Sequence, residues 1–184
     1  SQPSDTPSAT GFVVVDGEGL AVACNLTMYH LFGIGRTAPG LGIVIAAAPD
    51  GEMRHPFSLG PILVTRARDR AFRFGGAGSG GAAALTALAG VAALALIDNI
   101  PLKQAVEAPR LHHGGVPDRV SAEGAPLAAA LAGRGHRVEQ TASTARVNVI
   151  YCPAGLPGPS GDNDCTVAND NRGAGLSSVL KLQK

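Results

Sequence analysis

The stretch EAPRLHH occupies residues 107–113, and VPD follows it at residues 116–118. Adjacent histidines can mark a metal site, but successive residues of an extended chain point to opposite sides. No cluster of cysteines or glutamates with zinc-ligand spacing accompanies His112 and His113. A triad of Asp16, His112 and a serine has no supporting spacing either. We therefore expect a structural role for both histidines and no metal.

Three further segments are informative: TGFVVVD at residues 10–16, GSGG at residues 78–81 and ANDNRG at residues 168–173. In this order, the four segments resemble the small subunit of the γ-glutamyltransferases, which are N-terminal-nucleophile hydrolases. The resemblance covers residues 10–176, so residues 1–9 are expected to be a leader and residues 177–184 a tail. It implies an α/β (α+β) fold, the four-layer αββα sandwich of that superfamily, with this chain as the small-subunit half.

The composition indicates one globular domain with a sizeable core. The 184 residues are 45% apolar and 16% charged, and the formal net charge is only +1. Nucleic-acid binding needs clustered Lys and Arg, whereas the basic residues here are scattered among acidic ones, so no nucleic-acid partner is expected. The longest apolar run, residues 82–97, is shorter than the roughly 20 residues that cross a bilayer. It predicts a buried helix and no membrane span.

Apolar runs and turn residues predict strands, then helices, then strands again. Two runs joined by Gly17-Glu18-Gly19 predict a hairpin, because glycine supplies the positive φ of the turn. The continuous apolar run 41–48 predicts a strand covered on both faces. The expected strands are 12–16, 20–27, 41–48, 61–65, 70–74, 138–140, 146–151 and 165–168, and the expected helices are 82–97, one beginning near 99–101, and 125–133.

The three cysteines bear on whether the protein resides in an oxidising cellular compartment. Cys152 and Cys165 flank a Pro/Gly-rich loop, residues 153–161, which a disulfide could close in an oxidising compartment; the paired and unpaired states both stay open. Cys24 lies in an apolar strand pattern and is expected to be packing. The sequence does not fix the location, although a periplasmic or secreted protein is favoured over a cytoplasmic one.

The resemblance implies a nucleophile at the start of the first strand, with the free α-amine of that residue as its base. Thr10 directly precedes the apolar strand and is the local best fit. Ungapped counting back from Asp16, however, puts Ala9 at the nucleophile position, and Thr10 qualifies only if this chain is one residue shorter there. Three alternatives stay open: trimming to Thr10, a nucleophile at Ser1 or Thr6, or no nucleophile.

Other site residues follow from the same resemblance. Thr27 matches a second threonine that supports the nucleophile, and Tyr29 stands where the family often has a substrate-binding Asn. Ser58 matches a serine that contacts the substrate carboxylate. Gly80 and Gly81 match the turn whose N–H groups form the oxyanion hole, at a helix start where amides lack partners.

The acidic residues that hold the substrate ammonium in the family are missing at their usual place. Asp50 and Glu52 come only in a later loop. Either one of them folds back toward the substrate, or the pocket prefers an acyl group without an ammonium, because an ammonium that loses water needs a carboxylate partner. The second alternative is favoured.

The expected reaction is amide hydrolysis or acyl transfer through an acyl-enzyme on Thr10, without metal or cofactor. The expected partners are a large subunit cut from the same precursor and a small γ-glutamyl or acyl-amide substrate. Two alternatives remain: a catalytically inactive homologue that serves as a binding or assembly subunit, and an acylase with a non-glutamyl substrate.

Overall fold

A hairpin is the first element of the described residues. The computed structural model describes residues 9–48, 60–158 and 164–180. Strands β1 (Ala9–Val15) and β2 (Ala21–Thr27) pair antiparallel, from Val15 opposite Ala21 to Ala9 opposite Thr27. In the turn, Asp16 Oδ1 accepts the N–H groups of Glu18 and Leu20, both at 2.9 Å. The hairpin predicted from the sequence is confirmed.

A four-stranded antiparallel sheet lies beneath this hairpin, with strand order β3-β4-β8-β9. Its strands are β3 (Ile62–Thr65), β4 (Phe72–Ser79), β8 (Arg146–Leu156) and β9 (Thr166–Asn169). All four were expected, but β8 continues through Pro153 to Leu156, where the sequence predicted a loop. A disulfide joins Cys152 to Cys165 just before β9. The pairing that the sequence left open is therefore present.

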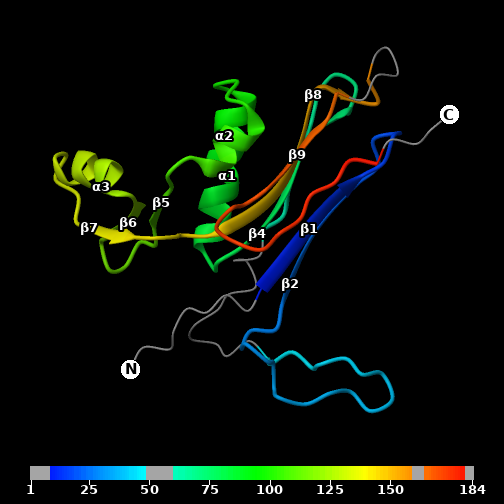
Figure 1. The fold of residues 1–184 in the computed structure, drawn as a ribbon, viewed down its shortest axis with the longest axis horizontal. Coiled ribbons are helices and arrows are strands. Elements are labelled where there is room, and N and C mark those ends of the chain that lie inside the picture. The colour runs from blue at the N-terminus through cyan, green and yellow to red at the C-terminus, as the bar shows by residue number, and fades with distance from the viewer. Residues whose placement is uncertain (1–8, 49–59, 159–163, 181–184) are drawn as a thin grey trace.

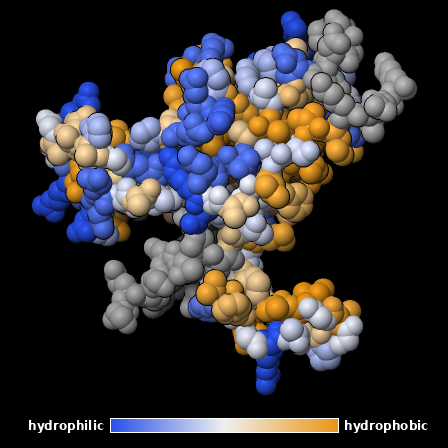
Figure 2. Space-filling model, in the orientation of Figure 1, coloured by the Kyte–Doolittle hydropathy of each residue, from blue (hydrophilic) through white to orange (hydrophobic). Residues whose placement is uncertain are grey.

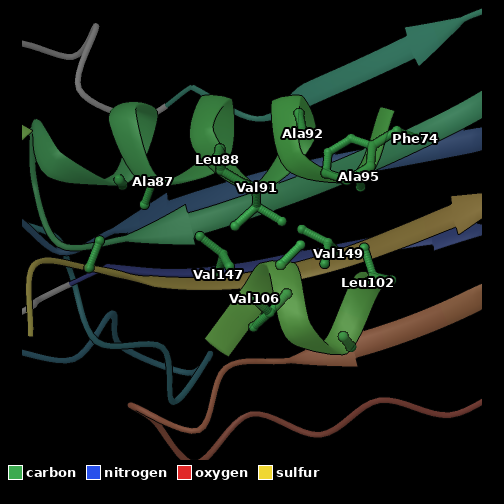
Figure 3. Close-up of a cluster of buried hydrophobic side chains, with 14 residues drawn as sticks. Phe74, Ala87, Leu88, Val91, Ala92, Ala95, Leu102, Val106, Val147 and Val149 are labelled. Carbon is green, nitrogen blue, oxygen red and sulfur yellow. The ribbon is translucent and has the colours of Figure 1, made fainter. Parts of the chain in front are cut away.

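Two helices cover the other face of this sheet. Helix α1 (Ala83–Leu96) is the predicted apolar helix, and α2 (Leu102–Glu107) begins directly after Pro101. The apolar side chains of α1 and α2 pack on the sheet, so the longest apolar run of the chain lies in the centre of the core, as the sequence predicted (Figure 3). The main core residues are Phe74, Leu88, Val91, Val106, Val147 and Val149. No helix within the described residues has the length and hydropathy that crossing a membrane requires.

The glycines of β4 explain how three layers pack so closely. A Cβ on Gly75 would lie 2.9 Å from Val13 in the hairpin, and one on Gly76 would lie 2.7 Å from Leu88 in α1. Real Cβ contacts are longer, so side chains on β4 would push both neighbouring layers away. The described residues thus form a helix layer, a sheet and a hairpin layer (Figure 1). This is the α-β-β part of the expected αββα sandwich.

A small third sheet lies to one side of these layers (Figure 1). It has the order β5-β6-β7, with β5 (Leu111–His113), β6 (Val120–Glu123) and β7 (Val138–Thr141). Helix α3 (Ala125–Ala132) connects β6 to its parallel partner β7. Helix α3 and β7 were predicted from the sequence, whereas β5 and β6 were not.

The predicted strand at residues 41–48 is wrong. This segment is a loop with a single bridge between Thr37 and Val44, and Leu41 and Ile43 are exposed. Gly40 and Gly42 have φ values of +76° and +65°, which interrupt an extended strand. An apolar run predicts burial but not the partner that buries it, and no described strand pairs with this segment.

Candidate active site

A pocket of about 420 Å³ opens at the start of β1. It lies where the hairpin layer meets the ends of β4 and β8 and the loop after β9. Its walls are the first residues of β1, the end of β4, the start of β8, Asp170 and residues 173–175. This is the strand start at which the sequence placed the nucleophile, so the pocket is the candidate active site.

The register of the hairpin decides which β1 side chains face this pocket. Ala9 is paired with Thr27, and Thr10 is paired with Leu26. A Cβ on Gly11 would lie 2.7 Å from Ala77 Cβ in β4, so Gly11 and, by strand alternation, Ala9 face the sheet. Thr10 belongs to the outer face and is exposed. Thr10 lines the pocket because it lies between Ala9 and Gly11, which also line it. The side chain that shares a face with Thr27, however, is that of Ala9.

Thr27 and Tyr29 lie at the end of β2. The Thr27 hydroxyl accepts the N–H of Tyr29 at 3.1 Å. Tyr29 has a φ of +59°, an uncommon conformation for a residue with a side chain, and β2 ends just before it. Neither residue is among those described as lining the pocket. The structure therefore places Thr27 beside Ala9 and turns the chain at Tyr29.

Gly80 and Gly81 form the turn between β4 and α1. Their φ values are +125° and +63°, and a Cβ on Gly80 would lie 2.9 Å from Ala145 Cα, so the turn requires glycine. They follow Ser79, which lines the pocket. The N-cap residue of helix α1 is Ala82, which makes no side-chain cap, so amides of the first helical turn are left available. The glycines thus lie next to the pocket without being described as part of its lining.

Several residues named from the sequence cannot be placed. Ser58, Asp50 and Glu52, the candidates for binding the substrate carboxylate and ammonium, lie outside the described residues. The alternative nucleophiles Ser1 and Thr6 lie outside them as well.

A buried ionic network forms the floor beside the pocket. Arg110 Nη1 lies 2.7 Å from Asp170 Oδ2, Arg172 Nη1 lies 3.1 Å from Asp170 Oδ1, and Arg172 Nη2 lies 2.6 Å from Glu123 Oε2. Arg110 also donates to the Ala145 carbonyl at 2.9 Å. The network thereby joins the end of α2, strand β6 and the residue after β9. It explains why the sequence carries an arginine in EAPRLHH and an aspartate and an arginine in ANDNRG.

Opposing effects set the protonation of this network. Burial raises the pKa of Asp170, but the Arg172 N–H and the Arg110 charge outweigh it and hold the pKa below its ordinary 3.8. Burial likewise raises the pKa of Glu123, and Arg172 and Thr144 overcome it, so that this pKa also lies below its ordinary value. For Arg110, burial lowers the pKa. No pattern in the sequence marks Glu123, because its partners become neighbours only in the fold.

Two carboxamides hold the hairpin against the sheet around the pocket. Asn148 Nδ2 donates to the Gly11 carbonyl at 3.1 Å, and Asn25 Nδ2 donates to the Gly78 carbonyl at 2.7 Å. Both cross from one β layer to the other. The start of β1 is therefore positioned by β8, and the end of β4 by β2. The sequence offered one signal for these residues, an amide side chain within an otherwise apolar strand.

The paired histidines have structural partners away from the pocket lining. His112 Nδ1 lies 2.9 Å from Thr86 Oγ1 in α1, and His113 Nε2 lies 2.9 Å from Asp118 Oδ1. Burial, with a smaller contribution from His113, lowers the pKa of His112. No three metal-binding side chains cluster within residues 9–48, 60–158 and 164–180. EAPRLHH thus ties α1, β5 and the ionic network together.

Comparison with protein families gives a match over residues 1–179 to the model described as Gamma-glutamyltranspeptidase. The chain belongs to the gamma-glutamyltranspeptidase family. A search of curated protein sequences found no match.

Solved structures of gamma-glutamyltranspeptidases share the fold. The enzyme from Pseudomonas nitroreducens, complexed with L-DON, has a TM-score of 0.74 and 22% identity, covering 94% of this chain and 100% of that chain. A threonine-to-alanine mutant of the Helicobacter pylori enzyme has a TM-score of 0.73 and 21% identity, covering 89% and 100%. The Bacillus anthracis transpeptidase CapD has a TM-score of 0.71 and 19% identity, covering 93% and 99%. The fold class expected from the sequence is confirmed.

Proposed function

We propose that this chain is the small-subunit half of a γ-glutamyltransferase-like amide hydrolase or acyltransferase. The observation that carries the proposal is the pocket at the start of β1, in a chain whose family match covers residues 1–179. Thr10 supplies the only hydroxyl of β1, and it lines this pocket. Ser79 lines the same pocket, and Gly80 and Gly81 follow it directly in the chain.

In this proposal a precursor is cut before Thr10. The new α-amine accepts the hydroxyl proton while Thr10 Oγ1 attacks the substrate amide carbon. The N–H groups at Gly80 and Gly81 stabilise the oxyanion, the proton passes to the leaving amine, and the C–N bond breaks. Water or an acceptor amine then attacks the acyl-enzyme and restores the hydroxyl. Without a preceding residue, Thr10 can rotate about ψ, which brings its hydroxyl from the outer face toward the pocket and Thr27.

A second candidate is an inactive homologue that binds a ligand or stabilises an assembly. The pairing of Ala9 with Thr27 favours it, because Ala9 then occupies the position of the nucleophile and has no hydroxyl. This candidate keeps the pocket and the ionic network but performs no chemistry. The two candidates differ in which β1 residue occupies the nucleophile position, Thr10 or Ala9.

The partner that we propose is a large subunit cut from the same precursor. The outer face of the hairpin is apolar and exposed: Phe12 is 45%, Val14 53% and Leu26 53% accessible. Apolar side chains also gather on the loop below it, which contains Leu41 and Ile43 (Figure 2). Burying a large apolar side chain is worth about 1.5–3 kcal/mol, so a layer that covers this face gains substantial stability. It would complete the fourth layer of the sandwich.

Point variants of the complete protein separate the two candidates. If Thr10 is the nucleophile, Thr10→Ala should abolish aniline release from acyl-anilides, and Thr10→Ser should retain part of it. Ala9→Thr should then bring no gain. If the catalytic position is Ala9, the unaltered protein should be inactive and Ala9→Thr should create activity. Full activity in Thr10→Ala would contradict the proposal, and Ser1→Ala and Thr6→Ala would then test the remaining hydroxyls.

A further inference from the structure

The candidate active site contains an arginine whose charge is not matched by a contacting acid. Of the pocket-lining residues, only Arg146 and Asp170 are charged. Within the described part of the chain, no carboxylate lies within ion-pairing distance of Arg146. A guanidinium at a pocket wall without a carboxylate partner is a ready site for an anion.

Neighbouring groups hold the stem and the Nε of the Arg146 side chain in place. It is the first residue of β8 and is paired with Ser79, the last residue of β4, so the two side chains share a face. Its Nε donates to the Arg172 carbonyl at 2.8 Å. A Cβ on Gly173 would lie 2.7 Å from Arg146 Cδ, so glycine makes room for the stem. These contacts fix the direction of the side chain and leave its two Nη groups for a ligand.

Asp170 does not neutralise this arginine. Its Oδ2 lies 2.7 Å from Arg110 and accepts the Val147 N–H at 3.0 Å. Its Oδ1 accepts from the N–H and the Nη1 of Arg172, both at 3.1 Å. The two acids and two arginines of the ionic network balance one another. Arg146 therefore gives the pocket a net positive charge.

We propose that Arg146 binds a carboxylate of the acyl group or ligand that enters this pocket, with the Ser79 hydroxyl beside it. The proposal rests on the proposed function in placing the acyl group here. Two Nη donors match the two oxygens of a carboxylate, whereas a lysine would offer only a point charge. The pocket volume of about 420 Å³ suits a small acyl compound.

This charge also determines what the pocket disfavours. An ammonium beside Arg146 would meet a like charge, and the oxygens of Asp170 are already occupied. A neutral acyl group would leave the guanidinium without a partner. The substrate class is therefore an acyl amide that carries a carboxylate and no ammonium, such as a glutaryl amide.

Three matched anilides test this inference. Glutaryl-anilide carries the carboxylate alone, γ-glutamyl-anilide adds the ammonium, and butyryl-anilide has neither charge. Their Kd values are measured by calorimetry on the complete protein carrying Thr10→Ala, which removes the proposed nucleophile's hydroxyl. Because this change would also block the proposed cleavage, the two subunits are expressed separately, with the small subunit beginning at position 10, and then combined. The same measurement is made after adding Arg146→Gln, Arg146→Lys or, as a control of equal charge change on an exposed arginine, Arg134→Gln.

We expect glutaryl-anilide to bind most tightly. Arg146→Gln should weaken its binding about 10- to 100-fold, because a charge-assisted hydrogen bond is lost. Arg146→Lys should restore part of the affinity, and Arg134→Gln should leave it unchanged. The Kd of butyryl-anilide should be the same in all of these variants. Added salt should weaken glutaryl-anilide binding to the protein with Arg146 intact, which tests the charge without any change at Arg146.

Three results would overturn the inference. The first is equal binding of glutaryl- and butyryl-anilide, and the second is an effect of Arg146→Gln no larger than that of Arg134→Gln. The third is tighter binding of γ-glutamyl-anilide than of glutaryl-anilide, which would show that the site holds an ammonium. Aniline release by the protein with Thr10 tests the proposed function separately. Binding that depends on Arg146 without turnover contradicts only the function, and turnover without this dependence contradicts only the inference.

Discussion

Arg110 and Asp170 form a buried ion pair, with Nη1 2.7 Å from Oδ2, beneath the wall of the candidate active site. Their side chains are only 6% and 2% exposed. The pair holds the start of β8, since Asp170 accepts the Val147 N–H and Arg110 donates to the Ala145 carbonyl. Arg146 lies between Ala145 and Val147 in the chain. The network therefore positions the residue that we propose to bind the substrate.

Asp170→Asn should destabilise the fold severely. It leaves Arg110 buried without its charge partner, and removing one member of a buried ion pair costs about 3–5 kcal/mol. Urea unfolding measures the loss. Glu139→Gln breaks the exposed pair with Arg119 and should cost less than about 1 kcal/mol. Equal losses in the two variants would show that the buried network does not hold the fold together.

Stability should fall in acid. The pKa of Asp170 is lowered by folding from its ordinary 3.8, and that of Glu123 from its ordinary 4.5. A lowered pKa contributes stability that is present above the ordinary value and is lost as the pH falls through the folded value. Thermal melts between about pH 6 and pH 2 should show this loss below about pH 4.5. A Tm that stays constant to about pH 2 would contradict the assignment.

The Cys152–Cys165 disulfide should add stability. It closes a loop with a sequence separation of 13, for which the chain-entropy model predicts about 3 kcal/mol. Replacing both cysteines by serine should lower the Tm by an amount that reductant reproduces in the unaltered protein. Cys24→Ser serves as the control for changing a cysteine outside the bridge. An unchanged Tm with and without reductant would show that the bridge does not form.

The outer face of the hairpin should bind the partner subunit. Phe12→Gln removes the largest apolar side chain on this face, and the loss of about 1.5–3 kcal/mol corresponds to a weakening of the subunit Kd of about 10- to 100-fold. Ile97→Gln makes the same kind of change on an exposed residue at the end of α1 and should have little effect. Sedimentation of the mixed subunits measures both. A monomeric, fully folded small subunit with no partner would refute the proposal.

The sequence predicted the elements whose pattern is local. The β1–β2 hairpin follows from glycines between two apolar runs, and α1 follows from an apolar run too long for a strand. Residues 41–48 show the limit, because an apolar run does not reveal whether this chain or another covers it. Glu123 joins a network whose members are distant in sequence, so no local pattern marks it.

The same limit applies to the site. The sequence predicted a nucleophile at the start of β1, and a pocket lies there. It could not tell which of Ala9 and Thr10 faces the sheet, because a shift of one residue reverses every side chain of a strand. Pairing with β2 settles this for the uncut chain, in which Ala9 faces Thr27. Cleavage before Thr10 would change that arrangement.

The identity of the first residue in the mature chain tests the central claim most directly. Mass spectrometry and N-terminal sequencing of the active protein, purified from its own precursor, should give a chain that begins at Thr10. Thr10→Ala should block this cleavage, because the hydroxyl that attacks the substrate is also expected to attack the preceding peptide bond. An active protein that retains Ala9 before Thr10 would contradict the account, because Thr10 would then have no free amine.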